Sequence, residues 1–316
     1  MQTRRYAAID IGTVTCRMLV ADVDDAGIHA LDREYGITNL GEGVDATGAL
    51  KPEAIDRVEA KIREYLATLD GYRTPEQPEI PIIAMATSAS RDASNADEFV
   101  ERLRSLGIEL TVIPGEREAG LSFAGATAAF PGETLMVVDV GGGSSELVVG
   151  RSGEEPLMVH SFNIGCRRVT ERFFHSDPPA ADEVAAADAW MRAEFQPYFD
   201  EMRARGIVLD RMVAVAGTAT SVVSMDKAMA VYDSSQVHGA PVTHERLDAI
   251  RDRMLGMTVE ERRHVVGLDP DRAPVIAAGM VILEAIVDLA GTDGYTTSEA
   301  DILEGIVMDA AKAEAR

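Results

Sequence analysis

The chain has 316 residues, 46% of them hydrophobic and 26% charged, which is ordinary for a globular protein of about two domains. A formal net charge of -23 excludes the classes of protein that hold duplex nucleic acid or an anionic membrane through a basic face, so we expect neither as a partner. Two cysteines are too few for a disulfide framework. No apolar run reaches roughly 18 residues and Asp10 interrupts the apolar N-terminus, so the sequence predicts a cytoplasmic protein without signal peptide or membrane span.

The first part of the chain alternates strand-forming and helix-forming segments. The expected elements are strands at 6–9 and 17–23, a helix from Pro52, a strand at 80–86, a helix from Asn95 to Gly107, a strand at 108–113 and a helix at 115–130. Asn95 and Glu98 have the spacing of a capping box. This alternation predicts a three-layer α/β domain.

The second part of the chain begins in the same way. It predicts strands at 135–140, 146–149 and 157–162, helices at 167–175 and 180–205, a strand at 212–216, a helix ending near Ala230 and a strand at 295–297. Pro197 is expected to bend or split the helix at 180–205. The apolar helices after Thr243 fit either a core or a dimer interface, and we favour the core. We place the domains at 1–130 and 131–316, with the C-terminal helix 300–316 able to pack on the first.

Two segments of the chain are similar to each other. IDIGTVTCRMLV begins at Ile9 and VDVGGGSSELVV at Val138, so that Asp10 aligns with Asp139 and Gly12 with Gly141. The offset of about 129 residues is longer than any solenoid repeat. The pattern predicts one strand–turn–strand hairpin in each domain, with chance similarity of two hairpins as the alternative.

The second hairpin turn has the residue types of a phosphate and metal site. Glycines at 141–143 let backbone amides converge on phosphate oxygens, and Ser144 and Ser145 add hydroxyl groups. Asp139 and Glu146 stand at opposite ends of the turn, where they can face each other across Mg²⁺. A plain tight hairpin is the alternative for a single turn of this kind.

Other phosphate and metal motifs are excluded. None of the four lysines follows a glycine as a P-loop requires, and a strand, not a helix, follows the glycines at 141–143, which excludes a dinucleotide fingerprint. The histidines form no HExxH motif, which excludes the common metallohydrolase pattern.

Two further positions have the residue types of a phosphate site. Arg91 follows a predicted strand, where a guanidinium can bridge two phosphate oxygens; an ion pair with Asp92 or Glu98 is the alternative. Thr218 lies in a Gly-Thr turn after another strand, where the amides at the start of the following helix can bind an anion.

Glu116 and Glu118 lie in the first turn of the helix at 115–130. The helix dipole favours carboxylates there, which is a sufficient structural explanation for one of them. If this helix faces a cleft, either glutamate can orient a water for attack on phosphorus.

Taken together, the chain resembles the exopolyphosphatase/guanosine pentaphosphate phosphatase family of the sugar kinase/actin superfamily. The similar segments follow the family's order from end to end: AIDIGTVTCRMLV, MATSASRDASN, IPGEREAGLSF, VVDVGGGSSELVVG, FNIGCRRVTERF, AVAGTAT and SEADILEGI. The resemblance implies an α/β fold of two ribonuclease H-like domains with an active cleft between them, and metal-dependent removal of terminal phosphate. It is to the short, two-domain members, so we expect a preference for short polyphosphates.

The resemblance also implies roles for individual residues. Glu118 corresponds to the family's catalytic base, and Asp139 and Glu146, with Asp10, to its acidic positions for Mg²⁺ or Mn²⁺. Val14 replaces the asparagine usual in the first turn, which removes one side-chain donor. Phosphate contacts fall on Thr13, Arg91, Gly141, Gly142, Gly143, Ser144, Ser145, Arg168 and Thr218.

We therefore expect an exopolyphosphatase that releases orthophosphate from the end of inorganic polyphosphate by metal-dependent hydrolysis, and that forms a homodimer. Three alternatives stay open. One is a pppGpp 5′-phosphatase that gives ppGpp, because the cleaved bond is the same. The others are a non-catalytic phosphate or nucleotide sensor and a kinase of the same superfamily.

Overall fold

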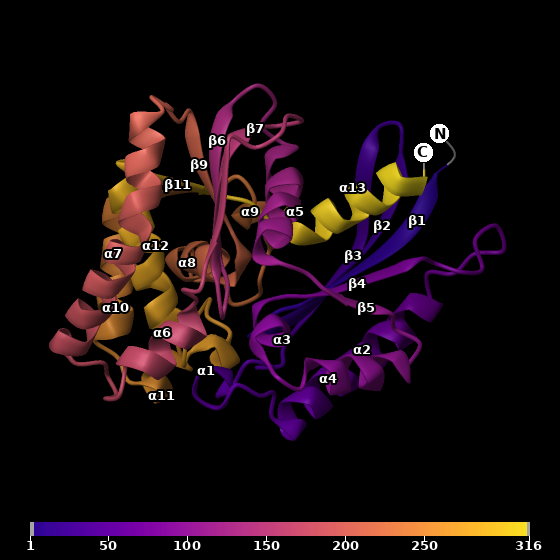
Figure 1. The fold of residues 1–316 in the computed structure, drawn as a ribbon, viewed down its shortest axis with the longest axis horizontal. Helices are drawn as coiled ribbons and strands as arrows, with labels where there is room; N and C mark the ends of the chain where they lie inside the picture. Colours follow the sequence, from indigo (N-terminus) through magenta and orange to yellow (C-terminus); the bar gives the residue numbers. More distant parts are fainter. Residues whose placement is uncertain (1–2, 315–316) are drawn as a thin grey trace. The chain divides into compact units, whose positions relative to one another are not determined.

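The computed structural model describes residues 3–314, and the chain divides into two compact units (Figure 1). The first unit is Met1–Gly125 with Asp301–Arg316, and the second is Ala126–Ala300. Helix α13 (Ile302–Glu314) is therefore part of the first unit, although it ends the chain. Residues 315 and 316 of the predicted C-terminal helix lie outside the described residues.

The first unit contains a mixed sheet with the strand order β3-β2-β1-β4-β5. β1, β2 and β3 pair antiparallel, and β4 and β5 continue the sheet parallel to β1. Besides α13, its elements are β1 (Arg4–Ile11), β2 (Thr15–Asp24), β3 (Gly27–Ile37), α1 (Val44–Thr47), α2 (Pro52–Asp70), β4 (Ile82–Ala86), α3 (Ser88–Asp92), α4 (Ala96–Arg104), β5 (Leu110–Val112) and α5 (Gly115–Thr127).

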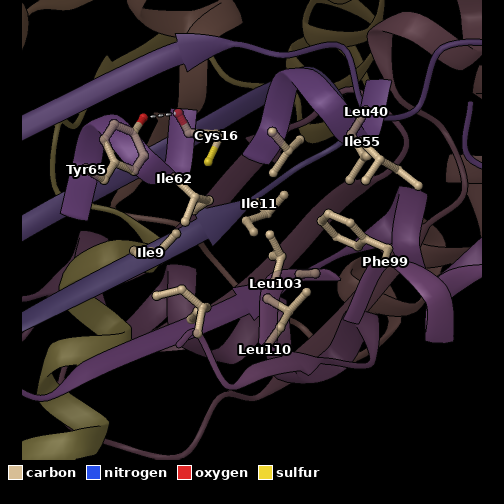
Figure 2. Close-up of a cluster of buried hydrophobic side chains, with 14 of the residues drawn as sticks. Ile9, Ile11, Cys16, Leu40, Ile55, Ile62, Tyr65, Phe99, Leu103 and Leu110 are labelled. Carbon is tan, nitrogen blue, oxygen red and sulfur yellow. Dashed lines mark hydrogen bonds between the residues drawn. The ribbon is translucent and has the colours of Figure 1, made fainter. Parts of the chain in front are cut away.

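Helices cover both faces of this sheet, because the side chains of β1 are buried on both. Ile9 and Ile11 pack in a cluster with apolar residues of α2 and α4, and Tyr65 of α2 donates its hydroxyl to the Cys16 carbonyl at 2.7 Å (Figure 2). The alternate residue Ala8 belongs to a second cluster with residues of α5 and α13. Successive side chains of a strand point to opposite faces of the sheet. Because both sets are apolar in β1, both faces of the sheet must be covered by helices. The predicted three-layer domain is confirmed.

The start of α13 is fixed by a reciprocal cap. The Asp301 side chain accepts from the Leu303 amide at 3.0 Å, and the Glu304 side chain accepts from the Asp301 amide at 2.9 Å. Each carboxylate also forms an ion pair with an arginine of the sheet, Arg17 or Arg33. The cap and the two ion pairs attach this end of α13 to β2 and β3.

The second unit has a sheet of the order β10-β11-β9-β6-β7-β8. β6, β7 and β8 pair antiparallel, β9 pairs parallel with β6, and β11 pairs parallel with β9, which repeats the arrangement of the first unit. Its elements are β6 (Thr134–Val140), β7 (Ser145–Arg151), β8 (Met158–Phe162), α6 (Cys166–Phe173), α7 (Ala181–Ala204), β9 (Arg211–Val215), α8 (Ala216–Asp226), α9 (Ser234–Val237), β10 (Pro241–Thr243), α10 (His244–Leu255), α11 (Val259–Arg262), the 3-10 turn η1 (Pro270–Arg272), α12 (Ile276–Ala290) and β11 (Gly294–Thr297).

The core of the second unit is built around α12. Nearly every residue from Ile276 to Val287 is buried, and the helix packs against α6, α7, α8 and α10. The predicted core placement of this apolar helix is confirmed. Among the described residues, no helix is both long enough and apolar enough to cross a membrane.

Three details of local structure differ from what the sequence analysis predicts or includes. The Asn95 side chain does not cap α4; it exchanges hydrogen bonds of 2.8 and 3.0 Å with the backbone of Leu50, a tertiary contact that its spacing to Glu98 does not reveal. Pro197 does not split its helix, since α7 runs without a break from Ala181 to Ala204; the bend stays a prediction. β3 was missed, because polar residues dominate this edge strand and its pairing with β2 holds it in place.

Candidate active site

The two predicted hairpins share a turn geometry. In the first unit the Gly12 amide donates to the Thr15 carbonyl at 2.8 Å, and in the second the Gly141 amide donates to the Ser144 carbonyl at 3.0 Å. Each turn joins two antiparallel strands, the first of which pairs parallel with the next strand of its sheet. The repeat seen in the sequence is therefore a structural repeat.

Two carboxylates face each other beside the second turn. Asp139 on β6 and Glu146 on β7 are direct partners in the antiparallel ladder, and both are buried, with 7% and 1% of their surfaces exposed. The Ser161 hydroxyl donates to Oε1 of Glu146 at 2.7 Å. Like charges directly across a ladder repel unless a cation lies between them. This oxygen donor set fits Mg²⁺ or Mn²⁺.

The corresponding pair in the first unit carries opposite charges. Asp10 faces Arg17 in the ladder, and Nη2 of Arg17 lies 2.7 Å from Oδ2 of Asp10. Burial raises the pKa of Asp10, and the Arg17 guanidinium opposes that rise. Asp10 thus has a cation of the protein as its partner, and its predicted role as a metal ligand stays a prediction. Arg17 was missed by the sequence reasoning, although its seven-residue distance from Asp10 equals that from Asp139 to Glu146.

The carbonyl side of the second turn is held by the start of α6. The amides of Cys166 and Arg167 donate to the carbonyls of Gly141 and Gly142, both at 2.9 Å. Carbonyl oxygens, which would repel an anion, are thereby engaged by α6. The arrangement fits the predicted phosphate role of the turn, which depends on its amides.

Glycine at 165 and arginine at 168 complete this support. A Cβ on Gly165 would overlap the Gly142 carbonyl and lie 2.5 Å from the carbonyl carbon of Gly143, so the backbone approach requires glycine. The Arg168 side chain donates from Nε to the Gly143 carbonyl at 3.0 Å. Arg168, predicted to bind phosphate, therefore also holds the turn from which phosphate would be bound.

The two serines of the second turn are buried. Ser145 is fully buried and its hydroxyl donates to the Ile164 carbonyl at 2.5 Å, while Ser144 is 3% exposed. The Ser145 hydroxyl thus donates its proton to a carbonyl of the same unit. This hydrogen bond joins the turn to the segment that leads into α6.

Thr13 in the first turn is buried, and its hydroxyl forms no hydrogen bond with any described residue. Its backbone carbonyl accepts from the Gly41 amide at 2.9 Å, and a Cβ on Gly41 would overlap the Thr13 side chain. A buried hydroxyl without a partner costs stability until a ligand or water satisfies it. Thr13 is therefore well suited to the phosphate contact predicted for it.

Arg91 and Glu118 meet in the first unit. Nη1 of Arg91, on α3, donates to the Ile113 carbonyl at 3.0 Å and lies 3.4 Å from Oε2 of Glu118, on α5. The Arg91 side chain keeps 24% of its surface exposed and Glu118 is largely buried. The structure thus brings together the predicted base and a predicted phosphate-binding arginine.

Thr218 lies in the first turn of α8, which follows β9 without the predicted intervening turn. Ala216 at this junction has a φ of 65°, a left-handed conformation that costs an alanine about 1 kcal/mol. The Thr218 side chain faces Gly279 of α12, where a Cβ would lie 2.5 Å from its hydroxyl oxygen. Its backbone amide is therefore the group that the helix start can offer to an anion.

Arg272 is a cationic side chain that the sequence reasoning missed. Its guanidinium lies against Gly217, where a Cβ would overlap it. The start of α8 thus combines helix amides with a guanidinium. The glycine before Thr218 was the available signal, since it marks a close approach.

Comparisons with known proteins place the chain in one family. A family model for the Ppx/GppA phosphatase family matches residues 19–314. Exopolyphosphatase 2 of Mycobacterium tuberculosis is 37% identical over 329 residues, which covers 98% of this chain and 100% of that protein.

Solved structures of the same family are similar over the whole chain. The crystal structure of an exopolyphosphatase-like protein has a TM-score of 0.89 and 32% identity, with 100% of both chains covered. The Ppx/GppA family member of Aquifex aeolicus has a TM-score of 0.81 and 29% identity, with 99% of both chains covered. These likenesses confirm the predicted α/β fold of the actin and sugar-kinase type. The chain belongs to the Ppx/GppA phosphatase family and is an enzyme of the hydrolase class.

Proposed function

We propose that this enzyme is an exopolyphosphatase that hydrolyses the terminal phosphoanhydride bond of inorganic polyphosphate and releases orthophosphate. The name of the full-length relative from Mycobacterium tuberculosis supports the activity. The single observation that carries the proposal is the buried Asp139–Glu146 pair beside the Gly141–Ser145 turn, which offers carboxylates for a cation next to amides for a phosphate.

Asp139 and Glu146 would hold Mg²⁺ or Mn²⁺. The cation would supply positive charge to balance the negative charge of the phosphate oxygens. The amides of the Gly141–Ser145 turn bind phosphate oxygens, and α6 keeps the turn carbonyls away from them. The Thr13 hydroxyl would donate to a phosphate oxygen. Arg91 would donate to phosphate from those guanidinium N–H groups that do not contact the Ile113 carbonyl or the Glu118 carboxylate.

Glu118 would orient the attacking water and accept its proton. Arg91 lies 3.4 Å from Oε2 of Glu118 and restrains the carboxylate. Phosphoryl transfer needs positioning and charge stabilisation more than covalent help from the protein.

The acidic surface favours short chains as substrates. A formal charge of -23 repels every phosphate that extends past the binding groups. We expect kcat/KM at low ionic strength to be highest for short polyphosphates. Added salt screens the repulsion, so it should reduce the difference in kcat/KM between short and long chains. A preference for very long chains at low salt would contradict this part of the proposal.

Release of the 5′ terminal phosphate of pppGpp is the second candidate activity, because the bond is the same. Phosphate release should be measured from tripolyphosphate, longer polyphosphate and pppGpp, each with Mg²⁺, with Mn²⁺ and with chelator. The proposal expects metal-dependent turnover with the highest kcat/KM on a polyphosphate. Phosphate release from pppGpp alone would show that the protein is a pppGpp 5′-phosphatase and not an exopolyphosphatase. Binding of these substrates without phosphate release from any of the three would show that the protein is a non-catalytic sensor.

A homodimer is part of the proposal and is tested by light scattering of the full chain. The buried face of α12 belongs to the core of the second unit and is not the surface that would join two copies. A monomer at all concentrations would contradict the dimer and leave the proposed activity unaffected.

A further inference from the structure

A cluster of possible metal ligands lies in the second unit on α10 and α12. It consists of His244 and Asp248, four residues apart on α10, and of Glu284 and Asp288, four residues apart on α12. We call these residues the His244 cluster. The two helices pack against each other, so their i, i+4 faces bring the four side chains together.

The donor atoms of this cluster converge. One donor atom each from His244, Asp248 and Glu284 lies within 4.8 Å of the other two. Nε2 of His244 is 3.6 Å from Oδ1 of Asp248 and 3.0 Å from Oδ1 of Asp288. Tetrahedral ligands at Zn²⁺ bond lengths of 2.0–2.2 Å are about 3.4 Å apart, so these separations need only small side-chain rotations.

One carboxylate oxygen of the cluster lacks a hydrogen bond. Oδ1 of Asp248 is shielded from solvent and accepts none from the described residues, although His244 and Arg251 lie 3.6 and 3.5 Å away. The Asp248 side chain as a whole keeps 40% of its surface exposed, and Arg251 is its ionic partner at a long distance. A cation placed between Asp248 and His244 would be a closer partner for this oxygen.

Two arginines lie at the cluster without balancing its charge. Arg251 pairs with cluster carboxylates on both helices, and Arg192 pairs with Asp288. The same two guanidinium groups also pair with Asp252 and Asp188. Five carboxylates thus share two guanidinium groups, which leaves an excess of three negative charges. A divalent cation would reduce this excess, and Arg251 would keep Asp252 as a partner.

The backbone positions His244 independently of any ligand. Thr243 pairs with Gly294 in the β10–β11 ladder and caps α10 through its hydroxyl, and the His244 amide donates to the Asp293 carbonyl at 2.9 Å. Because the backbone at His244 is already held in place, metal binding costs little backbone conformational entropy there.

We propose that the His244 cluster is a binding site for a divalent transition metal of the Zn²⁺ class, which joins α10 to α12. The imidazole donor favours Zn²⁺ over Mg²⁺, whose preferred ligands are all oxygens. The site is separate from the Asp139–Glu146 pair in both its residues and its donor chemistry. Because the cation links two helices of the folded unit, its binding stabilises the native state.

The test is a titration of the full, metal-stripped chain with Zn²⁺ alone as the probe, in excess Mg²⁺ that occupies oxygen-only sites. His244→Ala and Glu284→Gln each remove one ligand. His264→Ala is the matched control, because His264 also faces a carboxylate four residues away, that of Glu260 at 3.2 Å, but within residues 3–314 it belongs to no group of three possible ligands.

The proposal expects one Zn²⁺ site in the native sequence and in His264→Ala. Its affinity should fall at least roughly 10-fold in His244→Ala and in Glu284→Gln. Zn²⁺ should raise the melting temperature of the native chain and of the control, and raise that of the two ligand variants less. Equal Zn²⁺ affinity in the native chain and in both ligand variants would overturn the proposal. A fall in Zn²⁺ affinity in His264→Ala as large as that in the ligand variants would also overturn it.

Discussion

Glu146 faces Asp139 across the β6–β7 ladder, at the position that Arg17 occupies relative to Asp10 in the β1–β2 ladder. One structural repeat has therefore diverged into a carboxylate pair in one unit and an ion pair in the other. The ion pair contains its own counter-charge, whereas the carboxylate pair presents two acidic side chains on one side of the turn. This difference favours the second unit as the place of the proposed metal.

Replacing Glu146 by Gln should remove most of the stabilisation that Mg²⁺ gives the protein, because it removes one of the two facing carboxylates while the Ser161 hydrogen bond to Oε1 can persist. Saturating Mg²⁺ should therefore raise the free energy of unfolding of the native chain more than that of the variant. Urea unfolding with and without Mg²⁺ measures both increases. Glu155→Gln, on an exposed loop of the same unit, should show the native increase. An equal increase in Glu146→Gln would contradict a metal site at this pair.

Replacing Arg17 by Met should have the opposite effect in the first unit. It leaves the carboxylates of Asp10 and Asp301 without their guanidinium and should cost roughly 2–4 kcal/mol, below the fully buried case because Arg17 keeps some solvent contact. The double variant Arg17→Met/Asp10→Asn should recover part of the loss. Arg4→Met, which breaks an exposed pair with Glu314, should cost at most about 1 kcal/mol. A cost for Arg17→Met as small as that of Arg4→Met would contradict the account of this ion pair.

Adding one methyl group at Gly165 should disturb the second turn. The new Cβ would overlap the backbone of Gly142 and Gly143, so Gly165→Ala should lose roughly 1–3 kcal/mol and lower kcat/KM for phosphate release. Gly120→Ala is the control, because nothing lies within 4 Å of its added Cβ and helix α5 should gain roughly 0.5–1 kcal/mol. Chemical unfolding and steady-state kinetics measure the pair. Native kinetics in Gly165→Ala would show that the turn need not keep its shape.

Glu183 near the start of α7 should make the protein sensitive to acid. Hydrogen bonds from Ser176 and from backbone amides lower the pKa of Glu183 to about 2, below its ordinary value of 4.5. A carboxyl whose folded pKa is lowered stabilises the fold above its unfolded pKa, and this contribution is lost as pH falls from about 4.5 to about 2. The stability difference between the native chain and Glu183→Gln should therefore be present at pH 7 and shrink through that window. A difference independent of pH would contradict the lowered pKa.

The sequence predicted those features that depend on local pattern. The strand at 135–140, the helix at 115–130 and the repeated Asp-x-Gly turns follow from periodicity and glycine placement, and the structure has all of them. It did not predict contacts between distant segments. Arg17 forms an ion pair with Asp301, which is far from it in the sequence. The edge strand β3 forms because it pairs with β2, and its own polar residues do not predict a strand.

The His244 cluster shows the same limit. The i, i+4 spacing of His244 and Asp248 was visible, but Glu284 joins them only because α12 packs on α10. Burial and partner choice, which decide whether a carboxylate is a ligand or an ion-pair member, are tertiary properties.

Glu118 is the residue whose replacement tests the central claim most directly. Phosphate release from tripolyphosphate should be compared among the native enzyme, Glu118→Gln and Glu116→Gln, a matched control on the same helix turn, with saturating Mg²⁺. The account predicts a fall in kcat of roughly 10²–10⁴-fold for Glu118→Gln with little change in KM, and a near-native kcat for Glu116→Gln. A near-native kcat in Glu118→Gln would contradict it.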